Sequence, residues 1–167
     1  AILGAKVEDV KEMIKNLNNQ KGICEIANDN AEGQVIVSGD KITINLFQNF
    51  LKEKKIKSIP LKVSAPFHCS LMDKASDMMK GYLNDIGLNE LRSNFISNVT
   101  AEFEKNSEKI KELLIKQVSS RVRWRESIIK STNKVNSIVE IGPGKILTGM
   151  NKRINRDFNL FSVSNLD

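Results

Sequence analysis

Hydrophobic and polar positions in the first 63 residues follow two alternating periods. Apolar residues recur every three or four positions in two segments, as on one face of an amphipathic helix: "VEDVKEMIKNLNN" (7–19) and "KITINLFQNFLKEKK" (41–55). Short apolar runs bounded by turn residues predict four strands: "AILGA" (1–5), "GICEI" (22–26), "QVIVSG" (34–39) and "SIPLKV" (58–63). The turn-rich "ANDNAEG" (27–33) separates the second and third strands. This βαββαβ order predicts a ferredoxin-like subdomain over residues 1–63.

The helical spacing also selects the residues expected to face the core of this subdomain. They are Val7, Val10, Met13, Ile14 and Leu17 in the first helix, and Ile44, Phe47 and Leu51 in the second.

From residue 64 onward, the pattern predicts strands alternating with helices. The expected helices cover 71–86, 107–118, 124–132 and 146–154, and the expected strands are "NFISNV" (94–99), "SIVEIG" (137–142) and "NLFSVS" (159–164). Such alternation is typical of a parallel sheet with helical crossovers. With three or four strands, residues 64–167 are expected to form the carboxy-terminal flank of a larger, α/β-hydrolase-like domain. The apolar set of helix 71–86 includes Met78 and Met79, which we expect in the core.

Composition places the chain among globular proteins. It has 167 residues, of which 40% are hydrophobic and 28% charged. No apolar run reaches the ~18 residues that a membrane span requires, and no segment predicts a signal peptide. Two cysteines, Cys24 and Cys69, fit a reducing compartment better than a disulfide framework, so a cytoplasmic protein is expected. The chain opens with an apolar run and no methionine, and we interpret it as a fragment that lacks an amino-terminal part.

The net charge of +6 favours an acidic partner, whether nucleic acid, anionic lipid or an acidic protein. The basic residues are spread along the sequence, and the clusters that stand out are Arg121, Arg123 and Arg125, then Lys152, Arg153 and Arg156. Aromatic residues make up only 5%, which provides few stacking platforms for single-stranded nucleic acid. One histidine and two distant cysteines do not supply the ligands of a metal site.

His68, in "VSAPFHCSLMDKAS" (63–76), is the main candidate for chemistry. It lies between a predicted strand and a predicted helix, where ligand sites of open α/β sheets collect. An imidazole exchanges protons near neutral pH and can act as a general base, although a lone histidine is more often structural or exposed than catalytic. Ser70 and Asp73 fit the S-x-x-D capping pattern, which predicts Ser70 as a helix N-cap and not a nucleophile. Adjacent side chains point in different directions, so Cys69 is predicted to be a small buried residue.

"GPGK" (142–145) has two interpretations. A phosphate loop requires G-x-x-x-x-G-K-[ST], and this segment lacks that spacing and has Ile146 where Ser or Thr should stand. We therefore predict a tight strand-to-helix turn that uses the backbone freedom of glycine.

Several segments together resemble the malonyl-coenzyme A:acyl carrier protein transacylases of type II fatty acid synthesis. "SAPFHCSLM" resembles the family's histidine motif, and "GQVIVSG" resembles a strand of its small ferredoxin-like subdomain. "KQVSSRVRWRES" is similar to its segment ending in Val-(Arg/Gln)-Trp, and "EIGPGKILTGMNKRI" to its carboxy-terminal signature. "AILGAK" resembles the strand that opens the small subdomain. The segments occur in family order.

The resemblance implies malonyl transfer from coenzyme A to the phosphopantetheine thiol of acyl carrier protein, with a serine nucleophile and no tightly bound cofactor. It implies that His68 is the general base and that the main-chain carbonyl of Gln117 orients it. Asn30 falls in a loop that overlooks the family's active site, which makes it a candidate substrate contact. Because acyl carrier proteins are acidic, the family would dock its partner on a basic face.

The chain departs from the family pattern in several respects. It contains no Gly-x-Ser-x-Gly, so the nucleophile is absent, as are the family's oxyanion-hole glutamine and malonyl-binding arginine. Arg121 stands where many members have proline, and Ala31 and Glu32 replace Ser-Pro. The chain alone is therefore expected to be inactive, with the missing half or another chain covering its exposed sheet edge. The alternatives are an acyltransferase domain of polyketide synthesis and a non-catalytic anion- or nucleic-acid-binding domain that uses the arginine run.

Overall fold

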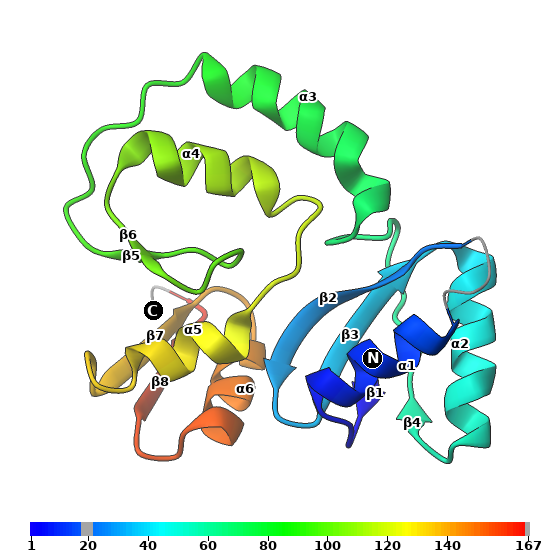
Figure 1. Ribbon diagram of the computed structural model, residues 1–167. Helices are drawn as coiled ribbons and strands as arrows, with labels where there is room; N and C mark the ends of the chain where they lie inside the picture. The colour runs from blue at the N-terminus through cyan, green and yellow to red at the C-terminus, as the bar shows by residue number, and fades with distance from the viewer. Residues whose placement is uncertain (18–21, 166–167) are drawn as a thin grey trace.

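The computed structural model describes residues 1–17 and 22–165 (Figure 1). The first part contains β1 (Ile2–Leu3), α1 (Val7–Leu17), β2 (Cys24–Ala31), β3 (Gln34–Gly39), α2 (Lys41–Glu53) and β4 (Lys57–Ser58). The second part contains the 3₁₀ turn η1 (Ser70–Met72), α3 (Asp73–Asn84), β5 (Phe95–Ile96), β6 (Phe103–Glu104), α4 (Ser107–Lys116), α5 (Trp124–Ser131), β7 (Ser137–Ile141), α6 (Ile146–Ile154) and β8 (Asn159–Val163). None of these described helices is both long and apolar enough to cross a membrane.

The first four strands form one antiparallel sheet in the order β2-β3-β1-β4. This is the predicted ferredoxin-like arrangement, since two split βαβ units interleave in it. The predicted core residues of both helices pack together: Val7, Val10, Ile14, Phe47 and Leu51 are buried, and Met13, Leu17 and Ile44 pack against them. Asn18 and Asn19, at the end of the first predicted helix, lie outside the described residues.

The turn predicted at 27–33 is wrong, because β2 continues through Ala31 and only Glu32 and Gly33 connect it to β3. Polar residues there remain in a strand because the chain supplies them with distant partners. Val122 forms a parallel bridge to Asn28, accepts the N–H of Asp29 and donates to the carbonyl of Ala27. Gly33, with φ of +71°, permits the tight connection.

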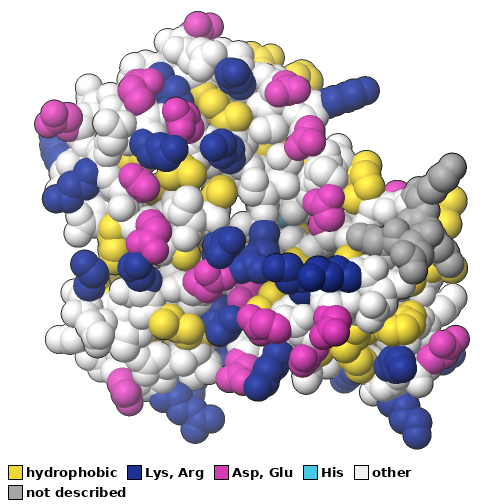
Figure 2. All heavy atoms as spheres, viewed as in Figure 1, with side chains coloured by type: hydrophobic (Ala, Val, Ile, Leu, Met, Phe, Trp, Pro, Cys, Tyr) yellow, Lys and Arg dark blue, Asp and Glu magenta, His cyan; other side chains and the backbone are white. Residues whose placement is uncertain are grey.

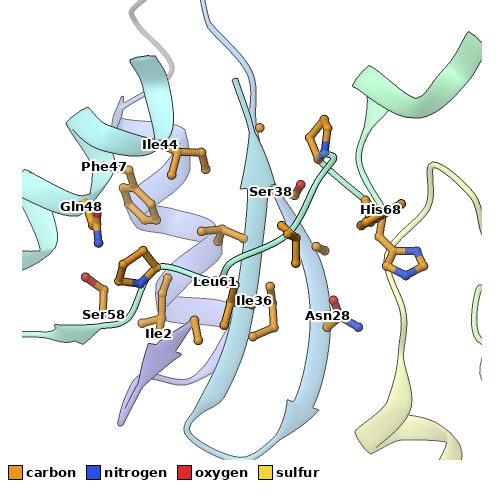
Figure 3. Close-up of a pocket in the computed structure, with 18 of the residues that line it drawn as sticks. Ile2, Asn28, Ile36, Ser38, Ile44, Phe47, Gln48, Ser58, Leu61 and His68 are labelled. Carbon is orange, nitrogen blue, oxygen red and sulfur yellow. The ribbon is translucent and has the colours of Figure 1, made fainter. Parts of the chain in front are cut away.

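The strand predicted at 58–63 is also mostly absent, because β4 ends at Ser58. Beyond it, Ile59 donates its N–H to the carbonyl of Ala1 over 2.8 Å, and Pro60 then has no N–H to continue the ladder. The segment 59–67 instead crosses the face of the sheet toward His68 (Figure 3).

The second part holds two small sheets in the described residues. β7 and β8 are parallel and α6 connects them, which is the predicted crossover. The strand predicted at 94–99 is reduced to β5, which pairs antiparallel with β6, an unpredicted strand, and so does not join β7 and β8. A tight turn explains this pairing, because Ala101 donates to Ser97 O and Ser97 donates to Glu102 O.

Helix α3 contradicts the predicted core. It has no buried residue, with Met78 66% exposed and Met79 40% exposed. In Figure 1 it lies along the outside of α4, the helix against which it packs. Tyr82 is also exposed, at 70%, whereas Ala75 and Leu83 are half-buried.

Candidate active site

The backbone at His68 adopts an unusual conformation. Its φ is +61°, in the left-handed region that β-carbon-bearing residues rarely occupy. Such a residue costs on the order of 1–3 kcal/mol and persists where surrounding contacts fix it. One of these contacts is the N–H of His68, which donates to the carbonyl of Val118 over 3.3 Å.

The imidazole of His68 is fixed by a main-chain carbonyl. Its Nδ1 lies 2.8 Å from the carbonyl oxygen of Gln117, and Figure 3 shows the ring directed toward the segment between α4 and α5. Gln117 is the C-cap of α4, where carbonyls have no partner within the helix. Because a carbonyl only accepts, Nδ1 carries a proton, and in the neutral ring Nε2 then holds the lone pair. The contact anticipated between these residues is thus present, while their roles in catalysis stay predictions.

Of the two residues after His68 for which a role was predicted, Ser70 differs from the prediction and Cys69 agrees with it. Ser70 is not an N-cap: η1 begins at Ser70 itself, and its hydroxyl donates instead to Glu25 of β2 over 2.5 Å. A nearby carboxylate attracts this hydroxyl away from the helix end. Cys69 is fully buried as predicted, and its thiol donates to the carbonyl of Pro66 over 3.1 Å.

An open groove of about 740 Å³ extends from His68 across the sheet to α2. Its walls are largely apolar and include Ile36, Phe47 and Leu61, with Asn28, Ser38 and Gln48 as polar groups (Figure 3). A mostly apolar channel with a few polar side chains suits an extended organic substrate.

Asn30, the candidate substrate contact, does not line this groove. It is a buried residue of β2 and not part of a loop, whereas Asn28 lines the groove beside His68. Regular alternation would place both on one face, but the register with β3 shifts between Asp29 and Ala31 and interrupts it. Asn28 was not predicted as a site residue, because its position on the groove follows only once residues 27–31 are known to be a strand.

The groove also contains the N-cap of α2. The carboxylate of Asp40 accepts hydrogen bonds from the N–H of Thr43 at 2.9 Å, the N–H of Ile23 at 2.6 Å and the hydroxyl of Thr43 at 2.8 Å. These bonds, led by that from the Thr43 N–H, lower the pKa of Asp40 from 3.8 to about 2. A fixed negative charge therefore stands at this end of the groove.

The arginine run is engaged within the chain. Arg121 and Arg123 both pair with Glu126, and Arg125 contacts both carboxylate oxygens of buried Asp29 at 3.0–3.1 Å. Figure 2 shows basic side chains near the middle of the viewed face bordered by acidic ones. These pairs leave the run poorly suited to phosphate contacts.

The "GPGK" segment forms the predicted tight turn, with positive φ at Gly142 and Gly144. Glu140 accepts from the N–H groups of Leu147 and Thr148 over 3.1 and 2.7 Å. A carboxylate therefore occupies the start of α6, where a phosphate would otherwise bind. In the described part of the chain, no cluster of three or more His, Cys, Asp or Glu has a metal-binding arrangement.

Comparison with known proteins adds to this geometry. The chain is 37% identical over 166 residues to "Malonyl CoA-acyl carrier protein transacylase" of Bacillus subtilis, covering 98% of this chain and 52% of that protein. The protein of the same name from Staphylococcus aureus is 37% identical over 169 residues, covering 100% of this chain and 55% of that protein. The chain is a homologue of the malonyl CoA-acyl carrier protein transacylases. The chain spans about half the length of these curated relatives. No protein-family model matches it.

Solved transacylase structures agree with the homology. The enzyme of Clostridium perfringens superposes with a TM-score of 0.93 at 37% identity, covering 99% of this chain and 52% of that one. A malonyl-transacylase crystallised with its type II polyketide acyl-carrier protein superposes with a TM-score of 0.92 at 32% identity, covering 98% and 53%. The mixed α/β fold of this chain therefore corresponds to part of the transacylase fold.

Proposed function

We propose that this chain is the carboxy-terminal portion of an enzyme that transfers malonyl from coenzyme A to the phosphopantetheine thiol of acyl carrier protein, in fatty acid biosynthesis. The observation that carries the proposal is the hydrogen bond between His68 Nδ1 and the Gln117 carbonyl, in a homologue of the transacylases. It leaves Nε2 as the proton acceptor. We divide the chain into a small subdomain (1–63) and a portion of the larger acyltransferase subdomain (64–167).

His68 acts as the general base in both halves of a ping-pong reaction. Its Nε2 takes the proton of a serine hydroxyl as the serine oxygen attacks the malonyl thioester, and the resulting imidazolium returns that proton to the departing coenzyme A thiolate. Nε2 then deprotonates the carrier thiol, whose sulfur attacks the malonyl-serine ester. As the ester C–O bond breaks, the imidazolium returns its proton to the departing serine oxygen and restores the serine hydroxyl. The serine belongs to the part of the enzyme that this chain does not include.

The Gln117 carbonyl fixes the imidazole without adding negative charge. A carboxylate at that position would stabilise the imidazolium more strongly, as in serine hydrolases. A neutral partner suits transfer to a thiol, whose proton is easier to remove than that of water.

The test is malonyl transfer by the complete enzyme carrying His68→Gln. We expect kcat to fall by about 10²–10⁴-fold, the usual contribution of a general base. Glu112→Gln, on the exposed side of α4, is the control and should retain full activity. Wild-type rates in His68→Gln would refute the assignment. The 167-residue chain alone should show no transfer, and measurable activity would contradict the need for a serine elsewhere.

An exposed lysine ridge provides a basic docking face for the acidic carrier. It consists of Lys52, Lys54, Lys55, Lys57 and Lys62, with Glu53 as the one acid in segment 52–62. The ridge adjoins Ser58 and Leu61 of the groove wall, and unlike the arginine run it forms no ion pair among the described residues. Charge complementarity of this kind accelerates association and weakens with salt.

Charge reversal at Lys54 and Lys57 tests this docking face. We expect the KM for the carrier to rise about tenfold while the KM for malonyl-CoA changes by less than about twofold. Reversal of Lys109, exposed on α4, is the matched control. An equal rise in both KM values would indicate that the lysines bind coenzyme A and not the carrier.

Polyketide synthesis is the second candidate setting, because a polyketide malonyl-transacylase superposes closely on this chain. The reaction is the same and only the carrier differs. The ratio of kcat/KM for the fatty-acid carrier to that for a polyketide carrier distinguishes the two.

We also propose that the rest of the enzyme, or another chain, covers the open edges of β7 and β8 and the exposed face of α3. Phe161 of β8 is 55% exposed and Ile146 at the start of α6 is 69% exposed. Val139, Ile141 and Val163 in the same two strands are also exposed, and a contiguous set of exposed apolar side chains marks an interaction surface. Hydrogen exchange of β8 amides should be slower in the complete enzyme than in this chain, and equal rates would refute the cover.

A further inference from the structure

Glu25 of β2 makes two hydrogen bonds to the segment that carries His68. One carboxylate oxygen accepts the main-chain N–H of Ser70 over 3.0 Å, and the other accepts the Ser70 hydroxyl over 2.5 Å. Glu25 and Ser70 are 45 positions apart in the chain, so local sequence patterns do not reveal this contact. Glu25 is half-buried, with its neighbour Cys24 fully buried in the sheet, so it projects from a rigid element.

The His68 turn is held from two sides. The end of α4 accepts the His68 N–H at Val118 and its Nδ1–H at Gln117. On the opposite side, Glu25 alone links Ser70 to the sheet by hydrogen bonds among the described residues. A residue at φ of +61° relaxes once it is held less firmly, because the left-handed region is unfavourable for it.

We infer that Glu25 is a positioning residue for His68: by clamping Ser70 against the sheet, it keeps the imidazole in line with the Gln117 carbonyl. This inference rests on the proposed function of His68. Both donors of Ser70 meet an acceptor-only group, so a carboxylate satisfies them together. Glutamine at this position offers these two donors one acceptor oxygen instead of two, and alanine offers none.

The experiment compares Glu25→Ala and Glu25→Gln in the complete transacylase, with Glu12→Ala on the exposed face of α1 as the matched loss of an acid. Because a displaced base loses reactivity without affecting substrate contacts, kcat should fall about 10–100-fold in Glu25→Ala. The KM for malonyl-CoA should stay within about twofold. Glu25→Gln should recover part of kcat, and Glu12→Ala should match wild type.

Imidazole ¹⁵N spectra provide a readout that does not depend on turnover. The His68 signal, identified by its loss in His68→Gln, should show the Nδ1-protonated form in wild type and a mixture of tautomers in Glu25→Ala. If Glu25→Ala does not fold, Glu25→Gln and Ser70→Ala give the answer, since Ser70→Ala loses one of the two bonds. Each should then lower kcat by a few fold with a smaller change in the same signal.

The outcomes separate the inference from the proposed function. Wild-type kcat and an unchanged His68 signal in Glu25→Ala and Glu25→Gln would overturn the role of Glu25 and leave His68 as the base. Full activity in His68→Gln would overturn the proposed function, and the His68 spectrum would still decide whether Glu25 positions the ring. A parallel loss in Glu12→Ala would also overturn the inference, since it would trace the effect to lost negative charge.

Discussion

The two parts of the molecule use the same amphipathic patterning with different results. In the first part, the apolar faces of α1, α2 and the sheet pack against one another. Ile2, Val10, Val35, Phe47 and Leu51 are almost completely buried there. In the second part, α4 and α5 bury some apolar residues, but α3, β7 and β8 bury none. Periodicity therefore identifies the apolar face of an element, whereas burial depends on whether a second element reaches that face.

The largest effect should come from the core of the first part. Phe47→Ala should lower the free energy of unfolding of the chain by about 3–5 kcal/mol, because a fully buried ring is replaced by a cavity. Met78→Ala on α3 should change it by less than about 0.5 kcal/mol, since that side chain is 66% exposed. Urea unfolding of both variants measures the difference. Equal losses would mean that α3 is covered in solution.

The element order of the first part could be predicted, as could the helices and the β7-α6-β8 unit of the second part, because helix and strand periods are local properties of the sequence. The two-residue strand β6 could not. Residues 27–31 could not, because Asn28, Asp29 and Asn30 resemble turn residues. Their place in a strand depends on pairing with β3 and on contacts with Val122 and Arg125.

At the candidate site, the sequence motif predicted His68 as the main candidate for chemistry, and the family resemblance implied its contact with the Gln117 carbonyl. Sequence alone did not identify Glu25, Asn28 or the role of Ser70, because each depends on contacts between segments distant in the chain. Met78 and Met79 show a second limit of prediction from sequence. Their helical spacing predicts an apolar face, but no element among the described residues buries them.

The next effect concerns the ion pair that joins the two parts. Asp29 is 1% exposed, and Arg125 from α5 is its partner. Arg125→Ala leaves that carboxylate unpaired, which should cost about 2–3 kcal/mol after allowance for the partly exposed guanidinium. Lys109→Ala breaks the exposed Lys109–Glu112 pair and should cost less than about 0.5 kcal/mol. A similarly small loss in Arg125→Ala would show that the two parts adhere without this pair.

Acid should weaken the first part through Asp40. Its folded-state pKa of about 2 lies below the ordinary 3.8, so the carboxylate contributes stability that is present above pH 3.8 and is lost as pH falls toward 2. Asp40→Asn keeps a capping oxygen but does not titrate. The stability difference between wild type and Asp40→Asn should therefore shrink from pH 5 to pH 2. A constant difference across that range would contradict the depressed pKa.

The least disruptive comparison leaves the sequence unchanged and uses its two cysteines. Cys24 lies in the core of the first part, where burial raises the pKa of its thiol to about 12. Cys69 is equally buried but lies in the His68 turn, held by hydrogen bonds instead of by the apolar core. Thiolate labelling of either residue requires local opening. In increasing urea, we expect Cys69 to react before Cys24, as quantified by peptide mass spectrometry.

The order of labelling decides how the site is maintained. Hydrogen bonds at a half-buried turn exchange readily with water, whereas opening the sheet exposes a whole apolar cluster, so the turn should have the lower opening free energy. Simultaneous labelling at every urea concentration would mean that the turn opens only with the sheet, and the two parts would then form one cooperative unit. Earlier labelling of Cys69 would instead mean that the geometry at His68 can be lost while the ferredoxin-like sheet remains folded.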